Sequence, residues 1–241
     1  MLSKNQLKQH RQLEIKKYRQ REGVFVAEGP KVVGDLLTMG FKARIIYATE
    51  AWISATGFTD VQEVNEAELC KLSFLQHPQQ VVAEFFMKTP VVPSEFSSGL
   101  FLALDGVQDP GNLGTIIRIA DWFGINTIFC SEDTADAWNP KVVQATMGSI
   151  ARVNIIYLSL SELITSTPLP VYGTLLDGHN IYNEPLSKDG IIVMGNEGNG
   201  ISPQIRQLIT HKLLIPPYHE GPESLNVAIA TAITCSEFRR R

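Results

Sequence analysis

The chain has 241 residues, of which 44% are hydrophobic and 19% are charged, and its formal net charge is −4. This length allows one large domain or two ordinary ones, and the composition is that of a globular protein with a full core rather than a disordered or generic polyanion-binding chain. No apolar stretch approaches the roughly 20 residues of a membrane helix, the start lacks a signal-peptide core, and three scattered cysteines suggest buried, reduced thiols, so we expect a cytoplasmic protein.

The N-terminal part of the chain alternates helices and strands, which predicts a small α/β domain. It begins with a basic helix over about residues 3–21, and residues 1–22 hold seven basic side chains against two acidic ones. Asn65 followed by Glu68 has the spacing of a capping box. The remaining expected elements are strands at 24–27, 43–48, 61–64 and 81–87 and helices at 30–39 and near 50–55.

The distribution of charge is uneven along the chain. The chain ends on three arginines, 239–241, and residues 23–238 hold 11 basic and 23 acidic side chains, which is near −12. Positive charge at the ends of an acidic body can attract nucleic acid. A solvated amphipathic helix explains the basic N-terminus equally well. As candidate RNA-binding residues in that helix we take Lys4, Lys8, Arg11, Lys16, Lys17 and Arg19.

A segment rich in proline and serine follows the last strand of the N-terminal part. Such composition between periodic segments is typical of a linker. We therefore predict a domain at residues 1–90, a linker at 91–99 and a second domain at 100–241.

The second part alternates strands and helices regularly, which predicts a parallel, doubly wound α/β domain. Asn139-Pro140 is typical of a helix start, because Asn caps the helix and proline suits its first turn. Strands are expected at 100–104, 127–130, 152–157, 171–175, 191–194 and 212–215, and helices at 112–123, from Asn139 to before Gly148, and at 159–165, 202–209 and 224–238.

Three segments of this domain follow predicted strands, at the sheet edge where open α/β sheets bind ligands. The first places Asn112 at an expected helix cap and Arg118 among isoleucines, where a guanidinium must reach solvent or meet an anion. The second, residues 195–200, is a glycine-rich turn without the spacing of a dinucleotide fingerprint or the Lys-Ser/Thr of a phosphate loop. The third begins with Ser224, a candidate helix cap. Taken singly, each is also explained by an ordinary turn, cap or surface arginine.

Together the three segments resemble the SpoU branch of the SPOUT methyltransferases, RNA ribose 2′-O-methyltransferases that use S-adenosylmethionine. The likeness lies in Asn112-Leu113-Gly114 with Arg118, in Gly195-Asn196-Glu197-Gly198 and in Ser224-Leu225-Asn226-Val227. Residues 139–143 before Met147-Gly148 add to it, although Gln144 stands where an arginine is usual. Residues 1–87 resemble the family's smaller RNA-binding domain, which is similar to ribosomal protein L30e.

The resemblance implies a deep trefoil knot in the second domain and a homodimer whose active site is completed across the interface. It implies catalytic roles for Arg118, Asn112, Glu197, Ser224 and Asn226. The family's role for Arg118 is to accept the hydroxyl proton, but a guanidinium stays protonated in proteins, so we favour Arg118 as a clamp on a developing alkoxide and an adjacent phosphate. It implies S-adenosylmethionine binding by Thr174, Leu175, Gly195, Asn196, Gly198, Ile215, Pro217, Ser224, Leu225 and Asn226. Lys141 joins the candidate RNA-binding residues through the same likeness.

The expected function is therefore 2′-O-methylation of RNA, with ribosomal RNA favoured over transfer RNA. A catalytically silent RNA- or ribosome-binding protein would also have the basic ends. A nucleotide-dependent oxidoreductase would share the sheet but needs the early glycine fingerprint. A hydrolase using Ser224 lacks a nucleophile-elbow context for His211 or His219. The histidines and cysteines show no metal-ligand spacing, so we expect no metal.

Overall fold

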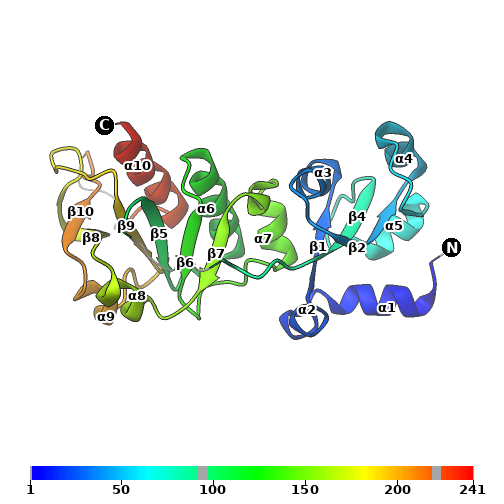
Figure 1. The fold of residues 1–241 in the computed structure, drawn as a ribbon, viewed down its shortest axis with the longest axis horizontal. Coiled ribbons are helices and arrows are strands. Elements are labelled where there is room, and N and C mark those ends of the chain that lie inside the picture. The colour runs from blue at the N-terminus through cyan, green and yellow to red at the C-terminus, as the bar shows by residue number, and fades with distance from the viewer. Residues whose placement is uncertain (1, 92–96, 219–223, 241) are drawn as a thin grey trace. The chain divides into compact units, whose positions relative to one another are not determined.

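The computed structural model describes residues 2–91, 97–218 and 224–240. Part of the expected linker, His219 and Arg241 lie outside these described residues. The chain forms two compact units, the first built from residues 1–89 and 136–151 and the second from residues 90–135 and 152–241. Figure 1 shows the elements of each unit.

The first unit is a four-stranded mixed sheet with helices, as the sequence predicts. Its strand order is β1 (Val24–Glu28), β4 (Val81–Phe86), β2 (Ala43–Ala48) and β3 (Gln62–Glu63), with β4 antiparallel to both neighbours and β2 parallel to β3. Its helices are α1 (Lys4–Gln12), α2 (Lys16–Glu22), α3 (Pro30–Thr38), α4 (Glu50–Thr56), α5 (Glu66–Leu72) and α7 (Pro140–Ala145). The capping box at the start of α5 is confirmed, because the side chains of Asn65 and Glu68 each accept from the other's backbone N–H.

The expected single basic helix is two helices, α1 and α2, so that prediction is wrong. The chain turns at Leu13, which is buried, and Ile15 is extended before α2 begins. The Arg19 guanidinium donates to the carbonyls of Leu13 and Glu14, at 2.8 and 2.7 Å, in the turn that follows α1. Carbonyls at a helix end lack partners within the helix, so this buried arginine stabilises the break.

Residues 136–151 pack within the first unit although they lie between two strands of the second unit in the sequence. The Trp138 and Phe25 rings are 4.5 Å apart between centroids, and Asp136 Oδ2 lies 2.5 Å from Arg19 Nη2. The sequence does not predict that residues 136–151 belong to the first unit. Asn139 caps α7 in the ordinary way, by accepting from the Lys141 N–H, and such a cap does not indicate which unit the helix packs in.

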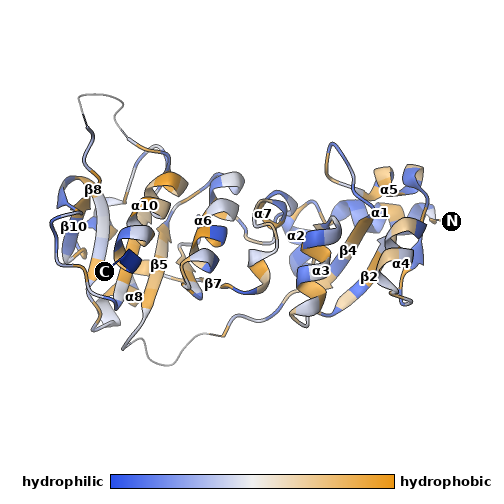
Figure 2. Cartoon of the chain, turned by 90° about the horizontal axis from the view of Figure 1, so that it is seen from above, coloured by the Kyte–Doolittle hydropathy of each residue, from blue (hydrophilic) through white to orange (hydrophobic). Residues whose placement is uncertain are grey.

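The second unit is a six-stranded, fully parallel sheet, which confirms the predicted class. Its strand order is β10 (His211–Leu214), β8 (Val171–Asn180), β9 (Gly190–Gly195), β5 (Leu100–Asp105), β6 (Thr127–Cys130) and β7 (Asn154–Tyr157). Helices α6 (Pro110–Trp122) and α10 (Val227–Arg240) cover one face, and α8 (Leu160–Ser166) and α9 (Pro203–Arg206) cover the other (Figure 1). The central strands are hydrophobic along most of their length, as the colouring of β5 in Figure 2 shows.

Two expected elements of this unit differ in length from the prediction. Strand β8 continues to Asn180, beyond the predicted end at 175, and α9 spans four residues where eight were expected. Within the described residues, no helix is long and apolar enough to cross a bilayer.

A buried ionic cluster ties α1 to the sheet of the first unit. The Nδ1 atom of fully buried His10 lies 2.7 Å from Glu84 Oε1, and Arg44 donates from Nε to Glu84 Oε2 at 2.7 Å. Burial raises the pKa of Glu84, but its bonds to His10 and Arg44 outweigh burial and hold that pKa below the ordinary value. The carboxylate is therefore charged in the fold and stabilises it.

We predict that Glu84→Gln lowers the free energy of unfolding by about 3 kcal/mol near neutral pH, because Arg44 and His10 lose their anion. A lowered carboxyl pKa contributes stability above the unfolded pKa of about 4.3, and this contribution is lost as the pH falls through the folded pKa. Urea unfolding of wild type and variant from pH 7 to pH 3 should show a difference that shrinks with acidity. Exposed Glu63→Gln is the matched control. A difference that grows as the pH falls would contradict this explanation.

Candidate functional site

The three segments singled out in the sequence meet at the carboxyl edge of the parallel sheet. Strands β5 and β9 are neighbours, and their last residues, Asp105 and Gly195, are paired in register. The loops that follow these strands therefore start side by side. A hydrogen bond between Asn226 and Asn112 adds the segment before α10 to this edge.

Glu197 is the hub of the site. Its Oε1 accepts from the backbone N–H of Asp109 and from Asn112 Nδ2, both at 3.1 Å, and its Oε2 accepts from the Gln108 N–H at 3.2 Å. Desolvation by neighbouring groups raises the pKa of this exposed carboxyl, but the hydrogen bonds outweigh it and the pKa lies below the ordinary value. A charged carboxylate thus holds the glycine-rich turn to the start of α6.

Asn112 also links the start of α6 to the start of the last helix, α10. Asn226 Nδ2 donates to Asn112 Oδ1 at 2.9 Å, and Asn226 Oδ1 accepts from the N–H groups of Ala228 and Ile229 at 3.0 and 3.3 Å. Glu197, Asn112 and Asn226 form one continuous chain of hydrogen bonds, which we call the Glu197 relay. It joins all three segments.

The structure corrects two predicted helix caps. Asp109 rather than Asn112 caps α6, since Asp109 Oδ1 accepts from the Asn112 N–H at 2.7 Å. The cap of α10 is Asn226, not Ser224, which is exposed two residues before it. The sequence held a signal for the first, because Asp109-Pro110 is an N-cap residue followed by proline in the first turn.

The glycine-rich turn is shaped by Asn196. Its Nδ2 donates to the Gly106 carbonyl at 2.7 Å, and its Oδ1 accepts from the N–H groups of Gly198 and Asn199. At Gly195 an added Cβ would lie 2.2 Å from the Gly200 carbonyl carbon, so close backbone approach requires glycine there.

Arg118 lies on the exposed side of α6. Ile116 and Ile117 beside it are fully buried, so the guanidinium reaches solvent rather than an anion within the chain. Within the parts of the chain that the structure describes, Arg118 has no hydrogen-bond or ion-pair partner. The structure does not bring it into the Glu197 relay.

The other residues predicted to bind the cofactor differ in how far their side chains are buried. Thr174 is partly buried and its Oγ1 lies 3.6 Å from Met194 Sδ, whereas the Leu175 side chain belongs to the core. Ile215 and Pro217 follow β10 at the same edge of the sheet. Sequence reasoning missed Asp105, whose Oδ2 accepts from the Ser202 N–H at 2.7 Å and fixes the start of α9.

This edge fits a flat ligand that is bound through backbone atoms and apolar contact. Gly198 is exposed, and a Cβ there would meet only Asn196 Oδ1, at 3.6 Å. The Leu225 side chain is 48% exposed directly before the α10 cap. This edge therefore offers open glycine backbone, an exposed apolar side chain and an anionic carboxylate to a ligand.

Most predicted RNA-binding side chains are exposed, but Arg19 is not. Its exposed fraction is 1% and it pairs with Asp136, so the prediction for Arg19 is wrong. Arg11 donates to the Ser73 carbonyl at 2.8 Å while remaining exposed. The remaining exposed candidates are Lys4, Lys8, Lys16, Lys17 and Lys141.

The basic C-terminal end is also engaged within the chain. Arg239 Nε donates to the Phe123 carbonyl at 2.8 Å, where α6 ends, and Arg240 pairs with Glu237 at 2.8 Å. Cationic donors at a helix C-terminus satisfy its free carbonyls, so Arg239 has a structural role.

The cysteines are free, but one departs from expectation. Cys130 and Cys235 are buried, and burial raises the pKa of the Cys235 thiol to about 12, whereas Cys70 is exposed. Across residues 2–91, 97–218 and 224–240, no group of three His, Cys, Asp or Glu could hold a metal ion.

Two family models match the chain. Residues 99–236 match the SpoU rRNA Methylase family, and residues 4–83 match the MRM3-like substrate binding domain. The 23S rRNA (guanosine(2553)-2′-O)-methyltransferase RlmP of Bacillus subtilis (strain 168) is 31% identical over 98% of this chain and 97% of its own length. Mitochondrial rRNA methyltransferase 3 of Mus musculus is 29% identical over 93% of this chain and 69% of its own length.

Solved structures agree with these sequence matches. A TrmH-family protein from Porphyromonas gingivalis is 44% identical with a TM-score of 0.89, covering 100% of this chain and 99% of its own. An AdoMet-bound rRNA methyltransferase from Sinorhizobium meliloti is 33% identical with a TM-score of 0.85, covering 100% and 96%.

The two functions of Asn226 can be separated by substitution. We predict that Asn226→Ala lowers the free energy of unfolding by about 1 kcal/mol, because α10 loses its cap. Asn226→Asp should keep that stability, since Asp caps as well as Asn, but should break the donation to Asn112. Thermal unfolding checks the first effect and titration with S-adenosylmethionine the second, where we expect both variants to bind more weakly. Wild-type cofactor affinity in Asn226→Asp would contradict a role for the relay.

Proposed function

The chain belongs to the SpoU rRNA methylase family, and on this premise we propose that it transfers a methyl group from S-adenosylmethionine to a ribose 2′-hydroxyl of ribosomal RNA. The observation that carries the proposal is the Glu197 relay, which assembles three distant segments at the ligand-binding edge of a parallel sheet. The similarity to RlmP makes the large-subunit rRNA the first substrate to test.

When bound, S-adenosylmethionine supplies an activated methyl electrophile. In the proposal, its adenosine part is held by backbone from Gly195, Asn196 and Gly198, by the loops around Thr174, Leu175, Ile215 and Pro217, and by Ser224, Leu225 and Asn226. Aligning donor and hydroxyl in such a pocket can lower a barrier by about 7–11 kcal/mol. Glu197 keeps the pocket assembled, and its negative charge favours a cationic ligand.

Arg118 is the proposed catalytic residue for the ribose. A guanidinium stays protonated in proteins, so it serves as an electrostatic clamp on the developing alkoxide and the neighbouring phosphate rather than as a base. Its exposure supports this assignment, because the group is available to a large substrate. Asn112, Ser224 and Asn226 orient the reacting groups.

A homodimer is part of the proposal. Trp122 on α6 is 85% exposed and Ile229 on α10 is 53% exposed, and these two helices pack together. Large apolar side chains left exposed on adjacent helices are typical of an interface. Arg118 and Trp122 are four residues apart on α6 and so lie on the same helix face. A partner that covers Trp122 therefore also meets Arg118, which supports an active site completed by a second copy.

Three further features belong to the same proposal. The domain at residues 1–90, which includes a match to a substrate-binding model, presents exposed lysines to RNA and resembles ribosomal protein L30e. Residues 91–99 link it to the methyltransferase domain at 100–241. A trefoil knot in that domain is part of the proposal through the resemblance to the SPOUT methyltransferases. A cytoplasmic location remains a prediction.

Two alternatives stay open to experiment. Transfer RNA is the second substrate to test, because the fold also matches a tRNA-modifying enzyme of Aquifex aeolicus described as TrmH/SpoU, over 61% of this chain. The other alternative is a catalytically silent RNA-binding protein. Such a protein would not require the Glu197 relay, and it would transfer no methyl group to rRNA.

We predict that Arg118→Ala lowers the rate of methyl transfer at least about 100-fold, because the alkoxide loses its donor. S-adenosylmethionine affinity should change less than twofold, since Arg118 makes no contact with the Glu197 relay. Transfer of labelled methyl to rRNA fragments and calorimetric titration of the cofactor measure the two effects. Retained turnover would refute the assigned role.

Mixing two inactive variants tests completion of the site by a partner. Arg118→Ala and Glu197→Ala, coexpressed and purified as mixed dimers, should recover about half of wild-type activity, because one of the two sites in each mixed dimer is intact if Arg118 acts in the other subunit's pocket. No recovery in verified mixed dimers would show that each site uses its own Arg118.

A further inference from the structure

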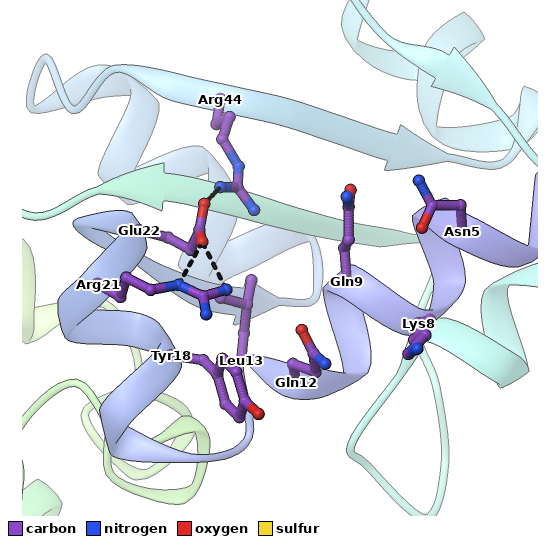
Figure 3. A pocket seen from close by; sticks show the side chains of 9 residues that line it. All are labelled: Asn5, Lys8, Gln9, Gln12, Leu13, Tyr18, Arg21, Glu22 and Arg44. Atoms are coloured by element: carbon purple, nitrogen blue, oxygen red, sulfur yellow. Dashed lines mark hydrogen bonds and ion pairs between the residues drawn. The ribbon is translucent and has the colours of Figure 1, made fainter.

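The first unit contains a polar pocket that the methyl-transfer site does not use. It has a volume of about 280 Å³ and lies among α1, α2 and β2 (Figure 3). That volume lies just below the roughly 300–1,000 Å³ of pockets that hold small ligands, so the pocket suits at most a single nucleoside-sized group. Its lining residues are Asn5, Lys8, Gln9, Gln12, Leu13, Tyr18, Arg21, Glu22 and Arg44.

One wall of the pocket is a row of polar side chains on α1. Asn5, Lys8, Gln9 and Gln12 are spaced three and four residues apart, so they share one face of the helix. Within residues 2–91, 97–218 and 224–240, none of these four side chains has a hydrogen-bond partner. Amide groups that both donate and accept, facing a hollow, can pair with the edge of a nucleobase.

The opposite wall is made of the Tyr18 ring and of two guanidinium groups that the Glu22 carboxylate holds in place. The Arg21 guanidinium lies 4.9 Å from the centroid of the Tyr18 ring, and Glu22 Oε1 accepts from Arg21 Nε at 3.0 Å (Figure 3). Glu22 Oε2 lies 3.4 Å from Arg44 Nη1. Aromatic rings and guanidinium planes are the surfaces on which unpaired bases stack.

The pocket is also electropositive and already ordered. The lining holds three cations, Lys8, Arg21 and Arg44, and one carboxylate, Glu22, which pairs with Arg21 and Arg44, so the lining carries an excess of positive charge. Arg44 is further fixed by the buried carboxylate of Glu84, at 2.5 Å from its Nη2. A site whose cations are held before binding loses less side-chain freedom when an anionic ligand arrives.

We infer that this pocket binds one unpaired nucleotide of the RNA substrate. The base stacks on the Tyr18–Arg21 pair, its edge pairs with Gln9 and Gln12, and its phosphate lies near Lys8. The inference rests on the proposed function, because it makes the pocket a substrate subsite. It adds base recognition to a domain otherwise expected to bind only phosphates. A phosphate alone would require the cations but neither the ring nor the amides.

The test compares single-stranded RNA octamers of adenosine, cytidine or uridine with an octamer of abasic ribose phosphates that carries the same charge. Binding to the full-length protein is followed by fluorescence anisotropy. At least one base octamer should bind about tenfold tighter than the abasic strand. Tyr18→Ala should reduce this preference to less than twofold without changing abasic binding, whereas Tyr18→Phe should keep most of it. Phe86→Ala, an exposed aromatic residue of the same unit outside the pocket, is the control and should have no effect.

Gln12→Ala is the second variant, because Gln12 lines the pocket and its loss should change the order of preference among the bases. Equal binding of base and abasic strands by wild type would overturn the inference, as would unchanged base preference in Tyr18→Ala. An acidic octapeptide that bound tighter than every RNA octamer would make the pocket a protein-docking site instead. Methyl transfer to rRNA is measured separately, so base-dependent binding without transfer would refute the proposed function and leave the pocket standing.

Discussion

The site depends on one carboxylate, Glu197, whose oxygens hold the start of α6 to the glycine-rich turn after β9. Asn112 and Asn226 extend this contact to the cap of α10, 114 residues along the chain. The Glu197 carboxyl keeps its charge because the hydrogen bonds that it accepts outweigh its desolvation and hold its pKa below the ordinary value. The loops that would form the donor pocket therefore owe their mutual arrangement to a few charge-assisted bonds.

Much of this arrangement could be predicted from the sequence, because apolar runs and turn residues mark parallel strands whose carboxyl ends must meet. The parallel sheet and the capping box at Asn65 are confirmed. The caps at Asp109 and Asn226, the split of the basic helix and the burial of Arg19 were not predicted. The burial of Arg19 depends on Asp136, a partner distant in sequence that local patterns do not reveal. The caps depend on competition between neighbouring polar residues, although the pair Asp109-Pro110 held a signal for the first of them.

The two units present different surface features. The first combines exposed lysines with an ordered polar pocket, and the His10–Glu84–Arg44 cluster that stabilises its fold also positions one wall of that pocket. The second presents Arg118 and Trp122 on one face of α6. Arg118 is charged and Trp122 is apolar, and both are exposed. Their exposure is explained if a second subunit covers Trp122 and an RNA phosphate pairs with Arg118.

The most direct test of the central claim is a crystal structure of the protein with S-adenosylmethionine. We expect the adenosine to lie against the main chain of residues 195–198, 215–217 and 224–226, with the hydrogen bonds among Glu197, Asn112 and Asn226 intact. A donor bound at another edge of the sheet, or bound here with those bonds broken, would contradict it.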